Sequence, residues 1–80
     1  MKLVFLGKLA DLAGEGEHAL AVSGPLDWAR LCARLDPAMR EAIGADDVRV
    51  AVDGVLLPDK RDLQAGEGSE VAFLPPVSGG

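Results

Sequence analysis

The chain has 80 residues, 49% of them hydrophobic, and a net charge of −5 at pH 7. This length predicts one domain, and this apolar content suffices for one compact core, which argues against disorder. The negative charge argues against nucleic acid as a main partner, because phosphate binding requires clustered Lys and Arg side chains. No apolar run is long enough to cross a bilayer, and the N-terminus lacks the apolar region of a signal peptide. We therefore expect a cytoplasmic protein without a membrane partner.

Metal and disulfide chemistry are restricted by the composition. The sequence contains one cysteine, Cys32, and one histidine, His18. A single cysteine excludes an internal disulfide, and an iron–sulfur cluster or a thiolate zinc site needs several ligands from the chain. We therefore expect no metal site and no cofactor bound by this chain.

The beginning of the chain predicts two strands joined by a short helical segment. Residues 2–7, KLVFLG, are rich in strand-forming residues and apolar on both faces, which is typical of a central strand. Residues 8–14, KLADLAG, fit one helical turn that ends at Gly14. Residues 17–22, EHALAV, predict a second strand, in which two alanines weaken the alternation of polar and apolar residues.

Two helices are expected next. We place the start of the first at residues 23–25, SGP, because proline suits the first helical position. A shorter helix follows from the capping pair Asp36-Pro37 and closes at Gly44. The first helix is amphipathic, because its apolar residues recur at the i, i+3, i+4, i+7 spacing of one face: Trp28, Leu31, Cys32 and Leu35.

The second half of the chain predicts three strands. Residues 48–54, VRVAVDG, alternate and end in an Asp-Gly hairpin signal, after which residues 55–57 return as a short strand. Residues 58–70 form a loop in the prediction, with Leu63 as its buried residue. Residues 70–75, EVAFLP, are the last strand.

The order strand, strand, helix, short helix, strand, short strand, strand indicates an α+β domain. The β-grasp, ubiquitin-like architecture fits this order best, with a mixed sheet, one main helix packed across it and a short second helix. We assign residues 1–75 to the β-grasp domain and residues 76–80 to an extended C-terminal tail.

The side chains that are able to perform chemistry have simpler explanations. Cys32 lies on the apolar helix face, so we expect a buried core cysteine and not a nucleophile. His18 has no Ser, Cys or Asp partner at a catalytic spacing. Lys60 and Arg61 form too small a basic patch for nucleic acid, so we expect either a contact at the rim of an acidic partner surface or no role. The sequence contains no catalytic side-chain constellation.

The last eight residues, FLPPVSGG, are the exception. Pro75 and Pro76 have no amide hydrogen, so the hydrogen-bonded ladder of the last strand must stop at them, and they hold the chain extended. Val77 and Ser78 follow as slim residues. We therefore expect a stiff, narrow segment that projects from the domain.

Two glycines complete this segment. Because Gly79 and Gly80 have no β-carbon, their backbone fits through a narrow channel. We expect the α-carboxylate of Gly80 to be the chemically active group and to enter the active site of another protein, with residues 75–79 giving it passage. The alternative is a flexible tail that ends in glycine and performs no chemistry.

The strand pattern also predicts a partner surface. Alternation sends Val4, Leu6 and Leu74 away from the helix, together with Ala72 and with Leu56 nearby. A small monomer rarely leaves such an apolar patch bare, so we expect Val4, Leu6, Leu56 and Leu74 at a partner interface. The alternative is that the loop of residues 58–70 covers the patch.

These features resemble the small subunit of molybdopterin synthase, the ubiquitin-like sulfur carrier of molybdenum-cofactor synthesis. The resemblance spans the whole chain. It rests on four stretches, which are VAFLPPVSGG (71–80), LQAGEGSEV (63–71), VAVDGVLL (50–57) and KLVFLGKLADLAG (2–14).

The resemblance implies a cycle of reactions at Gly80. An ATP-dependent activating enzyme adenylates the carboxylate, and sulfur transfer then gives a thiocarboxylate. The large subunit of molybdopterin synthase receives the tail, and the sulfur enters cyclic pyranopterin monophosphate to form the dithiolene of molybdopterin. In this scheme Leu56 and Leu74 match positions at the large-subunit interface, and the partner supplies the acid and base groups. The complex is either a heterodimer or a heterotetramer.

Two alternatives stay open. The same tail chemistry serves related carriers for thiamine synthesis or transfer-RNA thiolation, and isopeptide-forming protein modifiers. The carrier of thiamine synthesis is usually shorter and lacks the Pro-Pro-Val stretch found here at residues 75–77. The other alternative is a β-grasp interaction domain with an inert tail.

Overall fold

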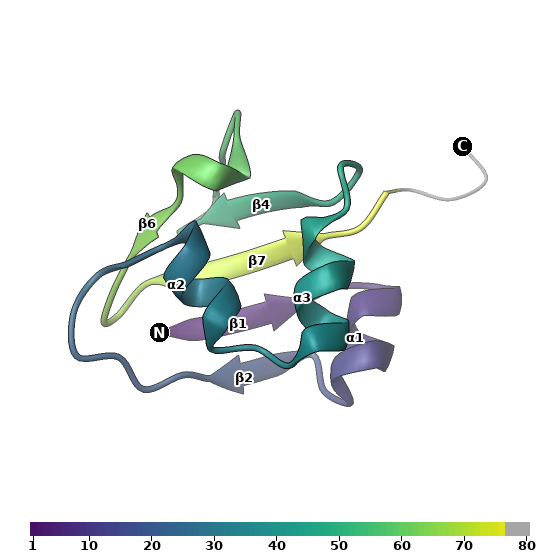
Figure 1. Cartoon of the computed structure of the whole chain (residues 1–80), viewed down its shortest axis with the longest axis horizontal. Helices are drawn as coiled ribbons and strands as arrows, with labels where there is room; N and C mark the ends of the chain where they lie inside the picture. The colour runs from purple at the N-terminus through teal and green to yellow at the C-terminus, as the bar shows by residue number, and fades with distance from the viewer. Residues whose placement is uncertain (77–80) are drawn as a thin grey trace.

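A five-stranded mixed sheet forms the base of the domain in the computed structural model, which describes residues 1–76 (Figure 1). The strand order is β2-β1-β7-β4-β5, and β3 and β6 form a second, two-stranded sheet. β1 and β7 are parallel, and the other neighbouring strands are antiparallel. The elements in chain order are β1 (Lys2–Phe5), α1 (Lys8–Ala13), β2 (Glu17–Ala19), β3 (Leu26–Asp27), α2 (Trp28–Ala33), α3 (Pro37–Gly44), β4 (Arg49–Val52), β5 (Val55–Leu56), the 3₁₀ turn η1 (Lys60–Asp62), β6 (Gln64–Ala65) and β7 (Glu70–Leu74).

The core lies between the sheet and the helices, with α2 and α3 in front of β1 and β7 in the view of Figure 1. Alternate residues of the two parallel strands face the helices and are at most 4% exposed: Leu3, Phe5, Val71 and Phe73. The rings of Phe5 and Phe73 stack with their centroids 5.3 Å apart. Burial of these side chains is the main source of stability, and the arrangement confirms the predicted α+β, β-grasp fold.

The first of the two predicted helices starts later than expected. The α2 helix begins at Trp28, and the carboxylate of Asp27 caps it by accepting a hydrogen bond of 2.8 Å from the Arg30 amide. Residues 26–27 pair with β6, and this pairing fixes them in an extended conformation that a helix cannot contain. The relative lengths were also wrong, because α2 has six residues whereas the helix predicted to be the shorter one, α3, has eight.

Local signals at the other element ends are confirmed. The α1 helix ends at Gly14, whose φ of 80° is the left-handed conformation that favours glycine. Asp36 caps α3 by accepting a hydrogen bond of 2.9 Å from the Met39 amide. Asp53 and Gly54 form the hairpin turn between β4 and β5 with φ of 50° and 83°. The second strand is shorter than predicted and ends at Ala19.

The predicted loop of residues 58–70 contains the η1 turn and β6. Its Leu63 is fully buried, as expected. The prediction for Lys60, a contact at the rim of a partner surface or no role, was wrong, because the side chain is buried inside the domain. The residue is 9% exposed, and its ammonium group lies 5.8 Å from the centre of the Trp28 ring. This segment therefore packs on the helix side of the sheet.

Candidate functional site

The site begins where the chain leaves the sheet. The β7 strand is third in the five-strand order, so the chain beyond Leu74 departs from the middle of one end of the sheet (Figure 1). The last paired residue on the β1 side is Phe73, opposite Phe5, and the last on the β4 side is Leu74, opposite Arg49. Pro75 and Pro76 follow without strand structure, as their missing amide hydrogens predict. We call residues 74–76 the root of the tail.

Gly7 leaves space for this root. A β-carbon at Gly7 would lie 3.2 Å from Cγ of Pro75, and the φ of Gly7 is 54°. A side chain at this position would therefore require both a strained backbone and a shift of the proline ring. Pro75 is half-buried here, and Pro76 is exposed.

Several predicted site residues cannot be placed. Val77, Ser78, Gly79 and Gly80 lie outside the described residues, so their roles stay predictions. The proposed boundary between the domain and the tail stays a prediction for the same reason.

The face of the sheet that points away from the helices carries the predicted partner residues. Val4 lies opposite Ala72, Ala72 lies opposite Ala51, and Ala51 lies opposite Leu56. These register pairs form one apolar row across four strands. Leu6 is 42% exposed and Leu56 is 49% exposed. We call the set Val4, Leu6, Ala51, Leu56, Ala72 and Leu74 the outer face.

Charged side chains flank this apolar row on both sides along the direction of the strands. At the end of β7 away from the tail, Nζ of Lys2 lies 3.2 Å from Oε1 of Glu17 and 3.8 Å from Oε1 of Glu70. The hydrogen bond and the charge of Glu17 raise the pKa of Lys2. At the tail end, Arg49 pairs with Leu74 across the sheet. The side chain of Arg49 therefore lies next to the root of the tail.

Arg49 and Ala51 also lie on the outer face and were not among the predicted partner residues. The alternation of VRVAVDG sends Val48, Val50 and Val52 to one face, so it also assigns Arg49 and Ala51 to the other. That signal was available in the sequence. The loop of residues 58–70 does not cover the outer face, because η1 packs near α2 on the opposite side of the sheet. The partner role of the outer face stays a prediction.

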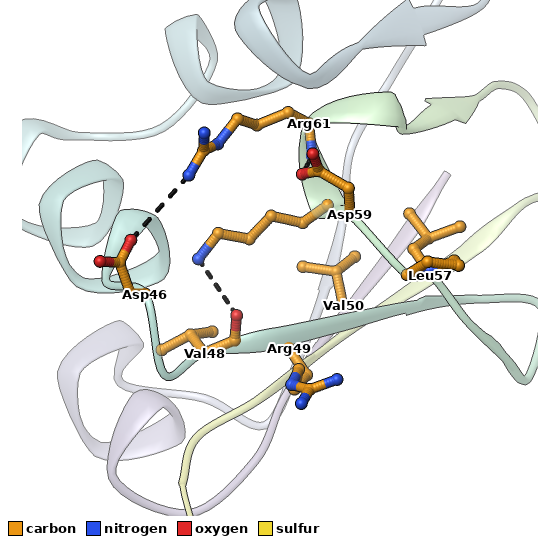
Figure 2. A pocket seen from close by; sticks show the side chains of 9 residues that line it. Asp46, Val48, Arg49, Val50, Leu57, Asp59 and Arg61 are labelled. Carbon is orange, nitrogen blue, oxygen red and sulfur yellow. Dashed lines mark hydrogen bonds and ion pairs between the residues drawn. The ribbon is translucent and has the colours of Figure 1, made fainter.

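A pocket of about 280 Å³ lies at the start of β4 (Figure 2). Arg61 points across it toward Asp46, with their charged atoms 3.9 Å apart, and the carboxylate of Asp59 accepts a hydrogen bond from the Arg61 amide. Arg49 lines the same pocket. Three cationic side chains, those of Arg49, Lys60 and Arg61, and the carboxylates of Asp46 and Asp59 line this pocket, and its lining includes no Ser, Cys or His side chain. The pocket therefore lacks the usual pair of a nucleophile and a base.

Cys32 and His18, the other side chains that could perform chemistry, have structural surroundings that do not favour catalysis. Cys32 is buried, as predicted, and burial raises the pKa of its thiol, which disfavours the reactive thiolate. His18 is exposed, and its Nδ1 lies 3.1 Å from Glu15. Within residues 1–76 no three His, Cys, Asp or Glu side chains are arranged to hold a metal ion. None of the helices in this part of the chain has the length and apolarity needed to span a membrane.

Comparison with solved structures gives two close similarities in fold. The crystal structure of SAMP1 from Haloferax volcanii has a TM-score of 0.77 and 24% identity, and the match covers 100% of this chain and 98% of that one. A crystal structure of the small archaeal modifier protein 1 of H. volcanii has a TM-score of 0.73 and 21% identity, with 96% and 97% covered. At these identities the likeness establishes the fold alone.

Comparison with protein families adds the assignment. No curated protein matches the sequence at a significant level. The profile of the ThiS family matches residues 3–80, which is almost the entire chain, including the Gly-Gly segment. The chain therefore belongs to the ThiS family of ubiquitin-like sulfur carriers.

Proposed function

We propose that this chain is the sulfur-carrying small subunit of molybdopterin synthase and that its working group is the α-carboxylate of Gly80. The observation that supports this is the stretch FLPPVSGG, in which the central strand runs directly into two prolines and then two glycines. Membership of the ThiS family supports the role of a sulfur carrier. The Pro-Pro-Val stretch favours a carrier for molybdopterin synthesis over one for thiamine synthesis. The proposal requires that Gly80 bear the free carboxylate in the working protein.

The chemistry follows from the weakness of a carboxylate as an electrophile. In the proposed first step, a carboxylate oxygen of Gly80 attacks the α-phosphorus of ATP on an activating enzyme, and pyrophosphate leaves. Hydrosulfide supplied by a sulfur donor then attacks the acyl carbon, AMP leaves, and loss of a proton gives a thiocarboxylate. The sulfur of this group is a soft nucleophile that is transferred to cyclic pyranopterin monophosphate without release of free sulfide. The carrier supplies no acid or base in this scheme.

The outer face has a defined role in the proposal. The outer face reaches the end of the sheet from which the root of the tail departs, since Leu74 belongs to both. A partner that covers Leu56 and Leu74 would bury exposed apolar area and at the same time fix where the tail enters its active site. We therefore propose that the activating enzyme and the large subunit of molybdopterin synthase dock on this face.

A second candidate function is protein modification. The structural neighbour SAMP1 is named a modifier protein, and it has the same fold as this chain. In that case the adenylated carboxylate of Gly80, or a thioester made from it, would be attacked by a lysine amine of a target protein. An isopeptide bond would form, and no sulfur would be delivered.

The test combines the full chain with ATP, a sulfur donor and an activating enzyme that acts on ThiS-family carriers. We expect the intact mass to rise by the difference between sulfur and oxygen, and we expect no change in a chain that lacks Gly80. Adding the large subunit and cyclic pyranopterin monophosphate then yields molybdopterin if the proposed recipient is right. Lysine-linked conjugates without molybdopterin would support the modifier, and an unchanged mass would support an inert tail.

A further inference from the structure

Lys60 is a buried cation with an unusual set of partners. Its ammonium group donates hydrogen bonds to the backbone carbonyls of Ile43 at 2.9 Å and of Val48 at 3.1 Å, and also to that of Ala45. An ammonium group has three hydrogens to donate, so these three acceptors satisfy it completely. The residue is the only charged or polar one that is buried in the described part of the chain.

The three carbonyls belong to the turn between α3 and β4. Ile43 lies in the last turn of α3, and Ala45 is its C-cap, where backbone carbonyls lack helical partners and a positive charge is favourable. Val48 directly precedes β4. Lys60 therefore connects the end of one element to the beginning of the next.

At this point β4 has no paired strand on its far side among residues 1–76. The β5 strand pairs only with Ala51 and Val52 of β4. The last backbone hydrogen bond along this edge of β4 runs from the amide of Leu57 to the carbonyl of Val50. The ammonium group of Lys60 takes the next carbonyl, that of Val48. Lys60 thus occupies the position where a neighbouring strand would hold the edge of β4.

The beginning of β4 also supports the root of the tail. Arg49 follows Val48 and pairs with Leu74, the last residue of β7. The pairing of β7 with β1 stops one residue earlier, at Phe73. Among the described strands, Leu74 therefore has β4 as its only paired neighbour.

We propose that Lys60 is a positioning residue for the tail, which fixes the start of β4 and thereby the direction in which the chain leaves the sheet after Leu74. The inference rests on the proposed function, since that direction matters when Gly80 must enter the narrow active site of an activating enzyme. A loosened root leaves the outer-face residues Val4, Leu6 and Leu56 in place for docking but lowers the fraction of docked molecules with Gly80 in the active site. The effect on catalysis is therefore on kcat and not on KM.

The test uses the full chain and three substitutions. Lys60→Met keeps most of the length of the side chain and removes its charge and its hydrogen-bond donors. Arg30→Met removes a positive charge from an exposed position on α2 and is the matched control. Leu31→Ala removes a fully buried side chain of α2 and controls for lost stability. If Lys60→Met does not fold, Lys60→Gln, which keeps two N–H donors, replaces it.

Two readouts separate positioning from general destabilisation. In Lys60→Met we expect faster amide hydrogen exchange at Arg49 and Leu74 than in the wild type, with little change at Val52 and Glu70 at the other end of β4 and β7. In the charging reaction we expect kcat to fall about tenfold with KM for the carrier within about twofold. We expect both controls to keep the wild-type kcat when corrected for the folded fraction.

The result that would overturn the proposal is a folded Lys60 variant whose kcat and exchange at Leu74 equal those of Arg30→Met. A fall in kcat no larger than that of Leu31→Ala would also overturn it. If the wild-type chain is not charged at all, the proposed function fails, whereas the exchange comparison still decides whether Lys60 holds the root of the tail.

Discussion

The two faces of the sheet differ although they are built from the same strands. On β7, Val71 and Phe73 face the helices and are 0% exposed, whereas Ala72 and Leu74 lie on the outer face and are partly exposed. The inner face has its contacts within the domain, so its apolar residues stabilise the fold. The outer face has no covering segment among residues 1–76, so its apolar residues are available to another protein. In this chain the alternation along a strand therefore places stabilising side chains on one face and the side chains proposed to bind a partner on the other.

The largest expected effect is the difference in stability loss between alanine substitutions at two adjacent β7 residues, Phe73 and Leu74, which face opposite sides of the sheet. We expect Phe73→Ala to lower the free energy of unfolding by about 3–5 kcal/mol, because it opens a cavity between the sheet and the helices. We expect Leu74→Ala to lower it by about 1 kcal/mol or less. Urea unfolding measures both free energies of unfolding. Equal losses in the two variants would show that the two faces of β7 contribute equally to stability.

A charge introduced on the outer face tests whether this face binds a partner. We expect Leu56→Glu to weaken binding to the activating enzyme about tenfold or more, because it places a carboxylate in an apolar contact. Its free energy of unfolding is expected to change by about 0.5 kcal/mol or less. Ala38→Glu, which adds the same charge to an exposed site on α3, is the matched control. Wild-type binding by Leu56→Glu would exclude this face from the contact.

The inner side is also expected to shield Cys32. Because burial raises the pKa of its thiol, we expect alkylation by iodoacetamide near neutral pH to be about tenfold or more slower in the folded chain than in urea. Cys32→Ala is expected to cost about 1 kcal/mol of stability and to leave charging of Gly80 unchanged. Loss of charging in a folded Cys32→Ala chain would show that the thiol takes part in the chemistry.

The smallest effect is expected at Lys2, on the exposed side of the sheet. Its pKa is raised above 10.5, chiefly by the hydrogen bond to Glu17, so its stabilising contribution is present below pH 10.5 and is lost as the pH rises through the higher value in the folded chain. We expect a small stability difference between wild type and Lys2→Met at neutral pH, which disappears at strongly alkaline pH. A difference in the free energy of unfolding between wild type and Lys2→Met that grows with pH would contradict a stabilising ion pair at Lys2.

Local patterns predicted most of the fold because they act over a few residues. The cap at Asp36, the turn at Asp53 and the alternation of β7 each depend on neighbours in sequence, and each was found where it was expected. The start of α2 and the burial of Lys60 depend on distant partners. Residues 26–27 are extended because they pair with residues 64–65, and Lys60 is buried because carbonyls of the α3–β4 turn satisfy it.

The candidate site shows the same division. The composition of FLPPVSGG and the strand alternation indicate the tail and the outer face without knowledge of the fold. That the tail leaves from the central strand follows from pairing between the first and last strands, which no local pattern encodes. The support of Leu74 by β4 and Lys60 depends on three distant segments and was not predictable.

The most direct test of the account is the intact mass of the full chain after incubation with ATP, a sulfur donor and its activating enzyme. We expect one sulfur in place of one oxygen, located at Gly80 by fragmentation, and no change in a chain without Gly80. An unmodified Gly80 in the presence of an enzyme that charges another ThiS-family carrier, or equal charging of the shortened chain, would contradict it.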